Sequence, residues 1–177
     1  MVRRSVAGLT VVDFFTRGYR ISGYLDVRSQ NLGDLLNDRL RTYLELVNVY
    51  ISRISNPGEI VATYPRAELS KDRLLFAVAP TEEGFVQAGR TTSYFGKQSR
   101  HAWLALPSFE IEGEFRFAGR TLDMESYLTR EPGTHIPILN ATARATAWPD
   151  FGFSGEVLLV NKQSIELFCL GEDQEPA

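Results

Sequence analysis

Apolar and polar residues alternate strictly in two segments, residues 19–27 and 109–117. The apolar and glycine positions are Tyr19, Ile21, Gly23, Leu25 and Val27 in the first segment, and Phe109, Ile111, Gly113, Phe115 and Phe117 in the second. A period of two is typical of a β-strand with one buried face. Each segment therefore predicts a strand. The glycine in the same inward position of both predicts a bend, a bulge or the close approach of another backbone.

The two strands belong to a longer match of the chain with itself. Matched positions share residue type and lie 90 to 92 residues apart: Ile21 with Ile111, Leu32 with Leu122, Thr42 with Thr134 and Lys71 with Lys162. Several blocks in the same order at a nearly constant offset indicate a tandem duplication. A single larger β-sandwich whose strands merely look alike is the alternative.

Further elements follow in each copy. Asn31 is placed to cap a helix whose leucines at 32, 35, 36 and 40 have helical spacing, and Thr121 precedes a similar segment at 122–128. Long strand patterns cover residues 43–55 and 135–148. Shorter strand patterns close the copies at 59–64, 74–79, 155–160 and 165–170. The tetrads 70–73 and 161–164 are interpreted as hairpin turns.

These patterns predict a mainly β protein with short helices. We expect two tandem small antiparallel β-barrel or curled-sheet units, each with about five strands and one short helix. The first unit would span residues 1–79 and the second 101–171. Residues 80–100 would form a connector, with a hairpin around Gly89, and residues 172–177 an acidic tail.

Composition and charge exclude several classes of protein. With 177 residues, 44% hydrophobic and 23% charged, the composition is that of a globular protein. A net charge of −3 provides no global basic field for nucleic acid or anionic membranes. No segment is apolar over the length of a membrane helix, so we expect no membrane insertion. The first residues lack a secretory signal and Cys169 is the single cysteine, which favours a cytoplasmic protein in which Cys169 is a small buried side chain.

No set of residues predicts catalysis. The histidines, His101 and His135, occupy non-equivalent positions of the repeat and belong to no cluster with metal-ligand spacing. The glycines form neither the GxGxxG motif of dinucleotide-binding proteins nor the lysine-containing phosphate-binding loop. The segment 152–155 is one residue too short for the GxSxG motif of a nucleophile elbow. We therefore expect a non-enzymatic protein without catalytic residues, cofactor or metal.

The polar faces of the two alternating strands differ between the copies. This candidate binding face comprises Arg20, Tyr24 and Arg28 in the first copy and Glu110, Glu112 and Glu114 in the second. Arginine and tyrosine in one copy where the other has glutamate suit different partners, or pairing of one face with the other across an oligomer interface. A hydrated surface without a partner is the alternative.

The first copy resembles the Sm-like and SH3-like small barrels. The resemblance lies in Ile21-x-Gly23-x-Leu25, in the run from Asp34 to Asn37, and in Leu44-x-Leu46. It implies a small-barrel architecture. It does not imply RNA binding, because the Arg-Gly element of Sm-like proteins is missing from residues 70–73. The chain is also similar to uncharacterised bacterial small β domains, a resemblance that implies no activity.

Two functions remain as expectations. The duplication, together with the lack of a catalytic set, favours a protein-binding protein or a self-associating subunit of an assembly. The alternative is nucleic-acid binding through the Arg/Tyr face of the first unit. Residues 1–53 are rich in arginine with interspersed tyrosines, which suits phosphate contacts and base stacking.

Overall fold

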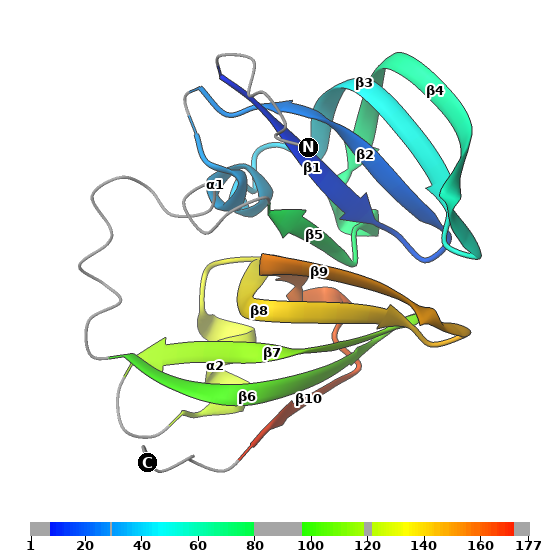
Figure 1. Ribbon diagram of the computed structural model, residues 1–177. Helices are drawn as coiled ribbons and strands as arrows, with labels where there is room; N and C mark the ends of the chain where they lie inside the picture. Colours follow the sequence, from blue (N-terminus) through cyan, green and yellow to red (C-terminus); the bar gives the residue numbers. More distant parts are fainter. Residues whose placement is uncertain (1–7, 29, 80–96, 119–121, 172–177) are drawn as a thin grey trace.

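The computed structural model describes residues 8–28, 30–79, 97–118 and 122–171 (Figure 1). The first half forms β1 (Leu9–Phe15), β2 (Tyr19–Asp26), α1 (Leu32–Asn37), β3 (Tyr43–Arg53), β4 (Asn56–Ser70), the 3-10 helix η1 (Lys71–Arg73) and β5 (Phe76–Ala79). The second half forms β6 (Lys97–Leu106), β7 (Phe109–Ala118), α2 (Met124–Arg130), β8 (His135–Ala145), β9 (Trp148–Asn161), the 3-10 helix η3 (Lys162–Ser164) and β10 (Leu167–Leu170). The mainly β class predicted from the sequence is confirmed.

The described strands form one ten-stranded sheet in the order β10-β6-β7-β8-β9-β5-β1-β2-β3-β4. All its pairings are antiparallel. The same order of elements recurs in both halves, and the last strand of each half pairs with the first, β5 with β1 and β10 with β6. The halves join where β5 pairs with β9. Each half thus contributes five neighbouring strands to the sheet, which is continuous through this junction.

The two inward glycines lie where the pairing shifts register, at Gly23 on β2 and Gly113 on β7. The neighbouring strands carry an asparagine with positive φ near this point, Asn48 at 51° and Asn140 at 46°. A Cβ added to Gly113 would lie 2.7 Å from the Leu139 carbonyl oxygen. The bulge and the close approach that the glycines predicted are both confirmed.

Both helices begin with side-chain caps; α1 is shorter than predicted, and α2 (Met124–Arg130) begins two residues later than the predicted segment 122–128. Asn31 accepts a hydrogen bond from the Asp34 amide, as the sequence suggested. The helix α1 ends at Asn37, and Leu40 lies beyond it with 96% of its surface exposed. The cap of α2 is Asp123, which accepts from the Ser126 amide. The predicted cap Thr121 lies outside the described residues.

The two tetrads are crossovers, and their interpretation as hairpin turns was wrong. Residues 71–73 and 162–164 form η1 and η3. The strand β4 pairs with β3, whereas β5 pairs with β1 and β9, so η1 connects strands that are not neighbours. The strand β6 begins at Lys97 and takes in the last four residues of the predicted connector. The rest of that connector, with the predicted hairpin around Gly89, and the tail 172–177 lie outside the described residues.

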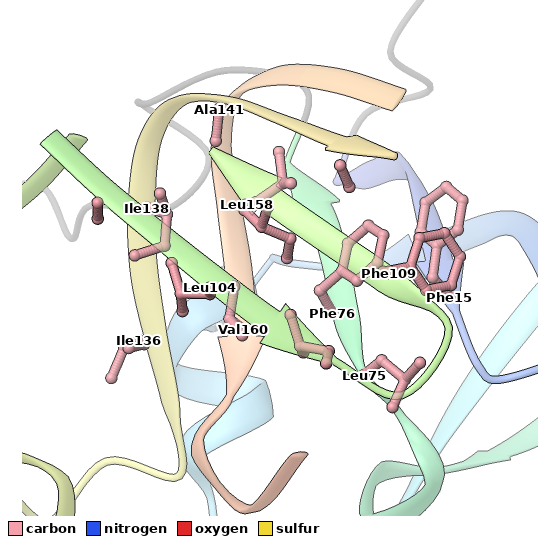
Figure 2. Close-up of a cluster of buried hydrophobic side chains, with 14 of the residues drawn as sticks. Phe15, Leu75, Phe76, Leu104, Phe109, Ile136, Ile138, Ala141, Leu158 and Val160 are labelled. Carbon is pink, nitrogen blue, oxygen red and sulfur yellow. The ribbon is translucent and has the colours of Figure 1, made fainter. Parts of the chain in front are cut away.

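Two buried clusters each draw mainly on one half. The first core includes Leu36 and Leu46 of the first half, and the second core includes Leu104 and Phe109 of the second half. At the junction, the strands β5 and β9 contribute side chains to both cores. On β5, Ala77 faces the first core and Phe76 the second, while on β9 Leu159 faces the first and Leu158 the second. Figure 2 shows Phe15 and Phe76 of the first half among side chains of the second. Because alternate side chains of a strand point to opposite faces, two paired strands suffice to link both cores.

Candidate functional site

Arg20, the first residue of the predicted binding face, lies at the junction of the halves. Its Nη2 donates to Asp13 Oδ2 at 2.9 Å. Its Cζ lies 5.8 Å from the ring centre of Phe153 on β9. The same aspartate accepts a hydrogen bond from Ser22. The guanidinium of Arg20 is therefore engaged within the chain, between a carboxylate and an aromatic ring of the other half.

The remaining residues of this face in the first half are Tyr24 and Arg28. Arg28 Nε donates to both Asp26 carboxylate oxygens at 3.0 Å. This side-chain hydrogen bond lowers the pKa of Asp26 to about 2, and the pairing raises the pKa of Arg28. Tyr24 is half-buried on β2. The structure places the three residues on one half and pairs both arginines with aspartates.

The acidic row of β7 forms a ladder of cross-strand pairs. Glu112 contacts His101 Nε2 at 3.0 Å and Arg144 at 3.6 Å. Glu114 accepts from Ser99 Oγ at 3.3 Å and from Asn140 Nδ2 at 3.4 Å. Glu110 lies opposite Arg144 in the β7–β8 register. These contacts stay within the second half, and the exposed pairs of this ladder are of the kind that contributes little to stability.

Polar side chains at the junction, half-buried at Asn37 and Thr134 and buried at Asn161, hold the halves together as a clamp, and the sequence alone did not reveal them. Asn37 Oδ1 accepts from the Thr134 amide at 2.7 Å, from the His135 amide at 2.9 Å and from Thr134 Oγ1 at 3.2 Å. Asn161 Nδ2 donates to the Leu74 carbonyl at 2.9 Å. Each bond joins residues of different halves. The clamp pairs backbone groups that would otherwise be buried without partners.

The matched lysines Lys71 and Lys162 bind the ends of the helices. Lys71 Nζ donates to the Leu35 carbonyl at 2.9 Å and also to the Asp38 carbonyl. Lys162 Nζ donates to the carbonyls of Tyr127 at 3.2 Å and Glu131 at 3.0 Å. Cations suit the negative end of a helix dipole. Burial lowers the pKa of both lysines, yet each remains the hydrogen-bonding cap of its helix.

His135 adjoins this clamp at the start of β8. It is 5% exposed, and its Nδ1 lies 3.0 Å from Thr134 Oγ1. Its Nε2 is sealed from solvent and has no hydrogen-bond partner among the described residues. Burial, and then the charge of Lys71, lower its pKa to about 4. The imidazole is therefore neutral at pH 7 and packed inside the junction.

Two open grooves flank the junction, one between the β1–β2 turn and η3, the other between the end of α1 and the start of β8. In the second groove Arg39 donates to the Pro132 carbonyl at 2.7 Å, and Arg41 lies 3.6 Å from Asp38. Its cations are thus already engaged. Among the described residues, no group of three or more His, Cys, Asp and Glu side chains is placed to hold a metal ion.

The strand β10 forms one edge of the sheet (Figure 1) and pairs with β6 alone among the described strands. Leu167 is 53% exposed, and Cys169 is exposed as well. Phe168 and Leu170 face the second core. The prediction that Cys169 is buried was wrong. A run of apolar residues is typical of a strand covered on both faces, but only one face of β10 is covered.

The chain has no match to a protein-family model, a curated protein or a solved structure. The resemblance to Sm-like and SH3-like barrels therefore remains a prediction. None of the described helices is long and apolar enough to span a membrane.

Proposed function

We propose that the chain is a non-enzymatic protein-binding protein or assembly subunit, and that it binds through the edge formed by β10. One observation carries this proposal. Leu167 and Cys169 occupy the positions on β10 that Phe76 and Val78 occupy on β5. Phe76 is fully buried against the second half, where its ring centre lies 5.0 Å from that of Phe109. The edge of β10 thus has the apolar character of a contact strand, and no described strand covers it.

The helices support the same proposal. In α1, Leu35 and Leu36 are buried in the first core, to which Val157 and Leu159 of the second half contribute. In the described residues of α2, none is buried. The second half covers one side of the first half, and nothing among the described residues covers the matching side of the second. An apolar edge strand with an exposed leucine suits pairing with another chain.

We also propose that the two halves arose by duplication. Supporting features are the recurring order of elements, the bulge beside a glycine and the lysine cap of each helix. Superposition of residues 8–79 on 101–170 in an experimental structure tests this origin. Failure of the paired elements to overlay would favour a single sandwich with similar strands.

Affinity purification from the cells that produce the protein tests the proposed function. The tagged wild type is compared with Leu167→Lys, which places a charge on the β10 edge. We expect a stoichiometric partner with the wild type and its loss with the variant. Leu40→Lys is the matched control, because it changes an exposed leucine far from β10 in the sequence. The proposal fails if no partner is retained by the wild type or if both variants retain it equally.

Nucleic-acid binding by the first half is a second candidate. Tyr43 and Tyr50 on β3 are exposed, at 55% and 42%, and lie on the same face of the sheet as Tyr24. Aromatic rings on one face suit the stacking of unpaired bases. The double variant Tyr43→Ala/Tyr50→Ala should weaken salt-dependent binding of a single-stranded oligonucleotide at least tenfold, by about 1 to 3 kcal/mol per lost stack.

Tyr64→Ala is the control for this second candidate, since Tyr64 is 56% exposed but lies on the opposite face, paired with Val49. Equal binding by all three proteins, or no binding by the wild type at low salt, would rule this candidate out.

A further inference from the structure

We propose that β10 of one copy pairs antiparallel with β10 of a second copy around a two-fold axis, so that the sheet continues from chain to chain. This inference rests on the proposed function and names the partner as the chain itself. It follows from three properties of the sheet: the apolar edge of β10, the use of the equivalent edge on β5, and the residues on the other open edge, β4.

The edge of β10 lacks most of the features that protect sheet edges. Its residues are Leu167, Phe168, Cys169 and Leu170, with no charge and no proline. Natural edge strands are guarded by charged side chains, prolines, bulges or short length. Of these protective features, β10 has only its short length of four residues. No described strand pairs with its outer edge, so its backbone groups there can bond to another apolar strand.

The equivalent edge in the first half is occupied. Outside its pairing with β1, β5 pairs antiparallel with β9, Phe76 opposite Val160 and Val78 opposite Leu158. All four side chains belong to or pack on the second core. The apolar edge of β5 is thus already paired with an antiparallel apolar strand, β9, within the molecule.

The strand β4 forms the other edge of the described sheet. It lacks the residues that allow β9 to pair closely with β5. On β9, Gly155 leaves room for Val78, since a Cβ there would lie 2.6 Å from Val78 Cγ1. At the matching position of β4 stands Tyr64, which pairs with Val49 as Gly155 pairs with Ala141. Repeating the junction between copies, β10 to β4, would therefore place a tyrosine ring where space is needed.

Charges on β4 oppose the same arrangement. Where β9 carries the buried Val157 and Leu159, β4 carries the exposed Arg66 and Glu68. Arg66 lies 3.5 Å from Glu45 on the neighbouring strand. Pairing with β10 would bring these charges beside Phe168 and Leu170 at a desolvation cost. Head-to-tail growth, which would produce rings or filaments, is thus disfavoured, and the strand of this chain that suits the β10 edge is β10 itself.

A two-fold pairing of β10 has a direct chemical signature. Leu167 and Cys169 of both copies lie on one face of the joined sheet, because residues opposite each other in an antiparallel pair share a face. If the axis lies between the two copies of Cys169, the thiols lie directly opposite each other; if it lies between the two copies of Phe168, they lie diagonally. In either case the Cys169 Cβ atoms are about 5 to 8 Å apart. Since Cys169 is the single cysteine, every thiol cross-link joins these two residues.

The test is sedimentation of the purified full-length chain over a wide concentration range, with cross-linking by a short bismaleimide. We expect a concentration-dependent dimer that is cross-linked through Cys169. Leu167→Lys should raise the dimer dissociation constant at least about tenfold, because it brings two like charges together on one face of the joined sheet. Leu40→Lys should dimerise as the wild type does. Circular dichroism verifies folding, and Cys169→Asp replaces Leu167→Lys if that variant does not fold.

Three outcomes would overturn the inference. They are a monomer at every concentration, a dimer insensitive to both β10 variants, and assemblies larger than a dimer that are lost in Arg66→Glu. The last would indicate the head-to-tail arrangement. A chain that is monomeric alone but retains a different protein through Leu167 would keep the proposed function while refuting self-pairing.

Discussion

At the scale of single residues, the junction contains buried and half-buried polar side chains, several of which bond to the other half. His135 illustrates the consequence. Its imidazole is neutral because burial and the Lys71 charge both oppose protonation. Any condition that protonates it must place a cation near Lys71 in a largely buried region.

We predict that His135 makes the fold sensitive to acid. Its pKa falls from 6.5 to about 4 on folding. Above pH 6.5 the side chain is neutral in both states and the stabilisation is fully present. As the pH falls from 6.5 toward 4, His135 becomes protonated in the unfolded chain but stays neutral in the folded chain. The free energy of unfolding therefore falls by about 3 kcal/mol. Urea unfolding across this range measures the loss.

His135→Phe should flatten the pH profile of stability over the same interval. His101→Gln is the control, because His101 is exposed and pairs with Glu112 on the surface. Both variants keep the carboxylates of the wild type, so only the histidine contribution differs. A profile for His135→Phe as steep as that of the wild type would contradict the role assigned to His135.

At the scale of elements, much of the structure follows from local patterns. The alternation at β2 and β7 predicted both strands, and Asn31 predicted the start of α1. The asparagine cap and the period of two act within a few residues, so a sequence reveals them directly. The crossovers η1 and η3 were not predicted, because a short polar segment does not show which strand the next segment will pair with.

The lysine caps lead to a prediction at this scale. Lys71→Met keeps the aliphatic stem but leaves the carbonyls of Leu35 and Asp38 without their buried donor. We expect a loss of about 1 to 3 kcal/mol in stability and faster amide hydrogen exchange in α1. The matched variant Lys162→Met should cost less, because the described residues of α2 include none that is buried. Equal losses for the two variants would contradict this explanation.

At the scale of the molecule, the two halves share side chains and should unfold together. Phe15 and Phe76 of the first half stack with ring centres 4.5 Å apart, and both contribute to the second core. A core that draws on both halves couples their stabilities, since removing one contributor leaves a cavity in the other half's interior.

Phe76→Ala tests this coupling. We expect a loss of about 3 to 5 kcal/mol, observed equally by far-ultraviolet circular dichroism and by tryptophan fluorescence. Both tryptophans, Trp103 and Trp148, lie in the second half and therefore report on that half alone. Ala67→Gly, away from the junction in the first half, serves as the comparison. Separate transitions for the two probes would mean that the halves unfold independently.

The candidate site includes side-chain contacts that the sequence alone did not predict. Arg20, Glu112 and their neighbours were found as exposed polar positions, but their pairing within each half depends on contacts across strands. The clamp at Asn37, Thr134 and Asn161 joins residues roughly ninety positions apart, so no local pattern marks it. The β10 edge carried a signal, its apolar run, which was interpreted as burial.

The chain's own residues were enough to establish the mainly β class, the repeated order of elements, the glycine bulges and the cap of α1, because each depends on backbone and side-chain preferences over a short span. Tertiary structure decided which edges meet. The strands β5 and β10 have similar apolar sequences, yet β5 lies between β1 and β9 while β10 has β6 alone among the described strands. Hydrogen-bond partners of a strand come from distant parts of the chain, so the same local sequence can be interior in one half and an open edge in the other.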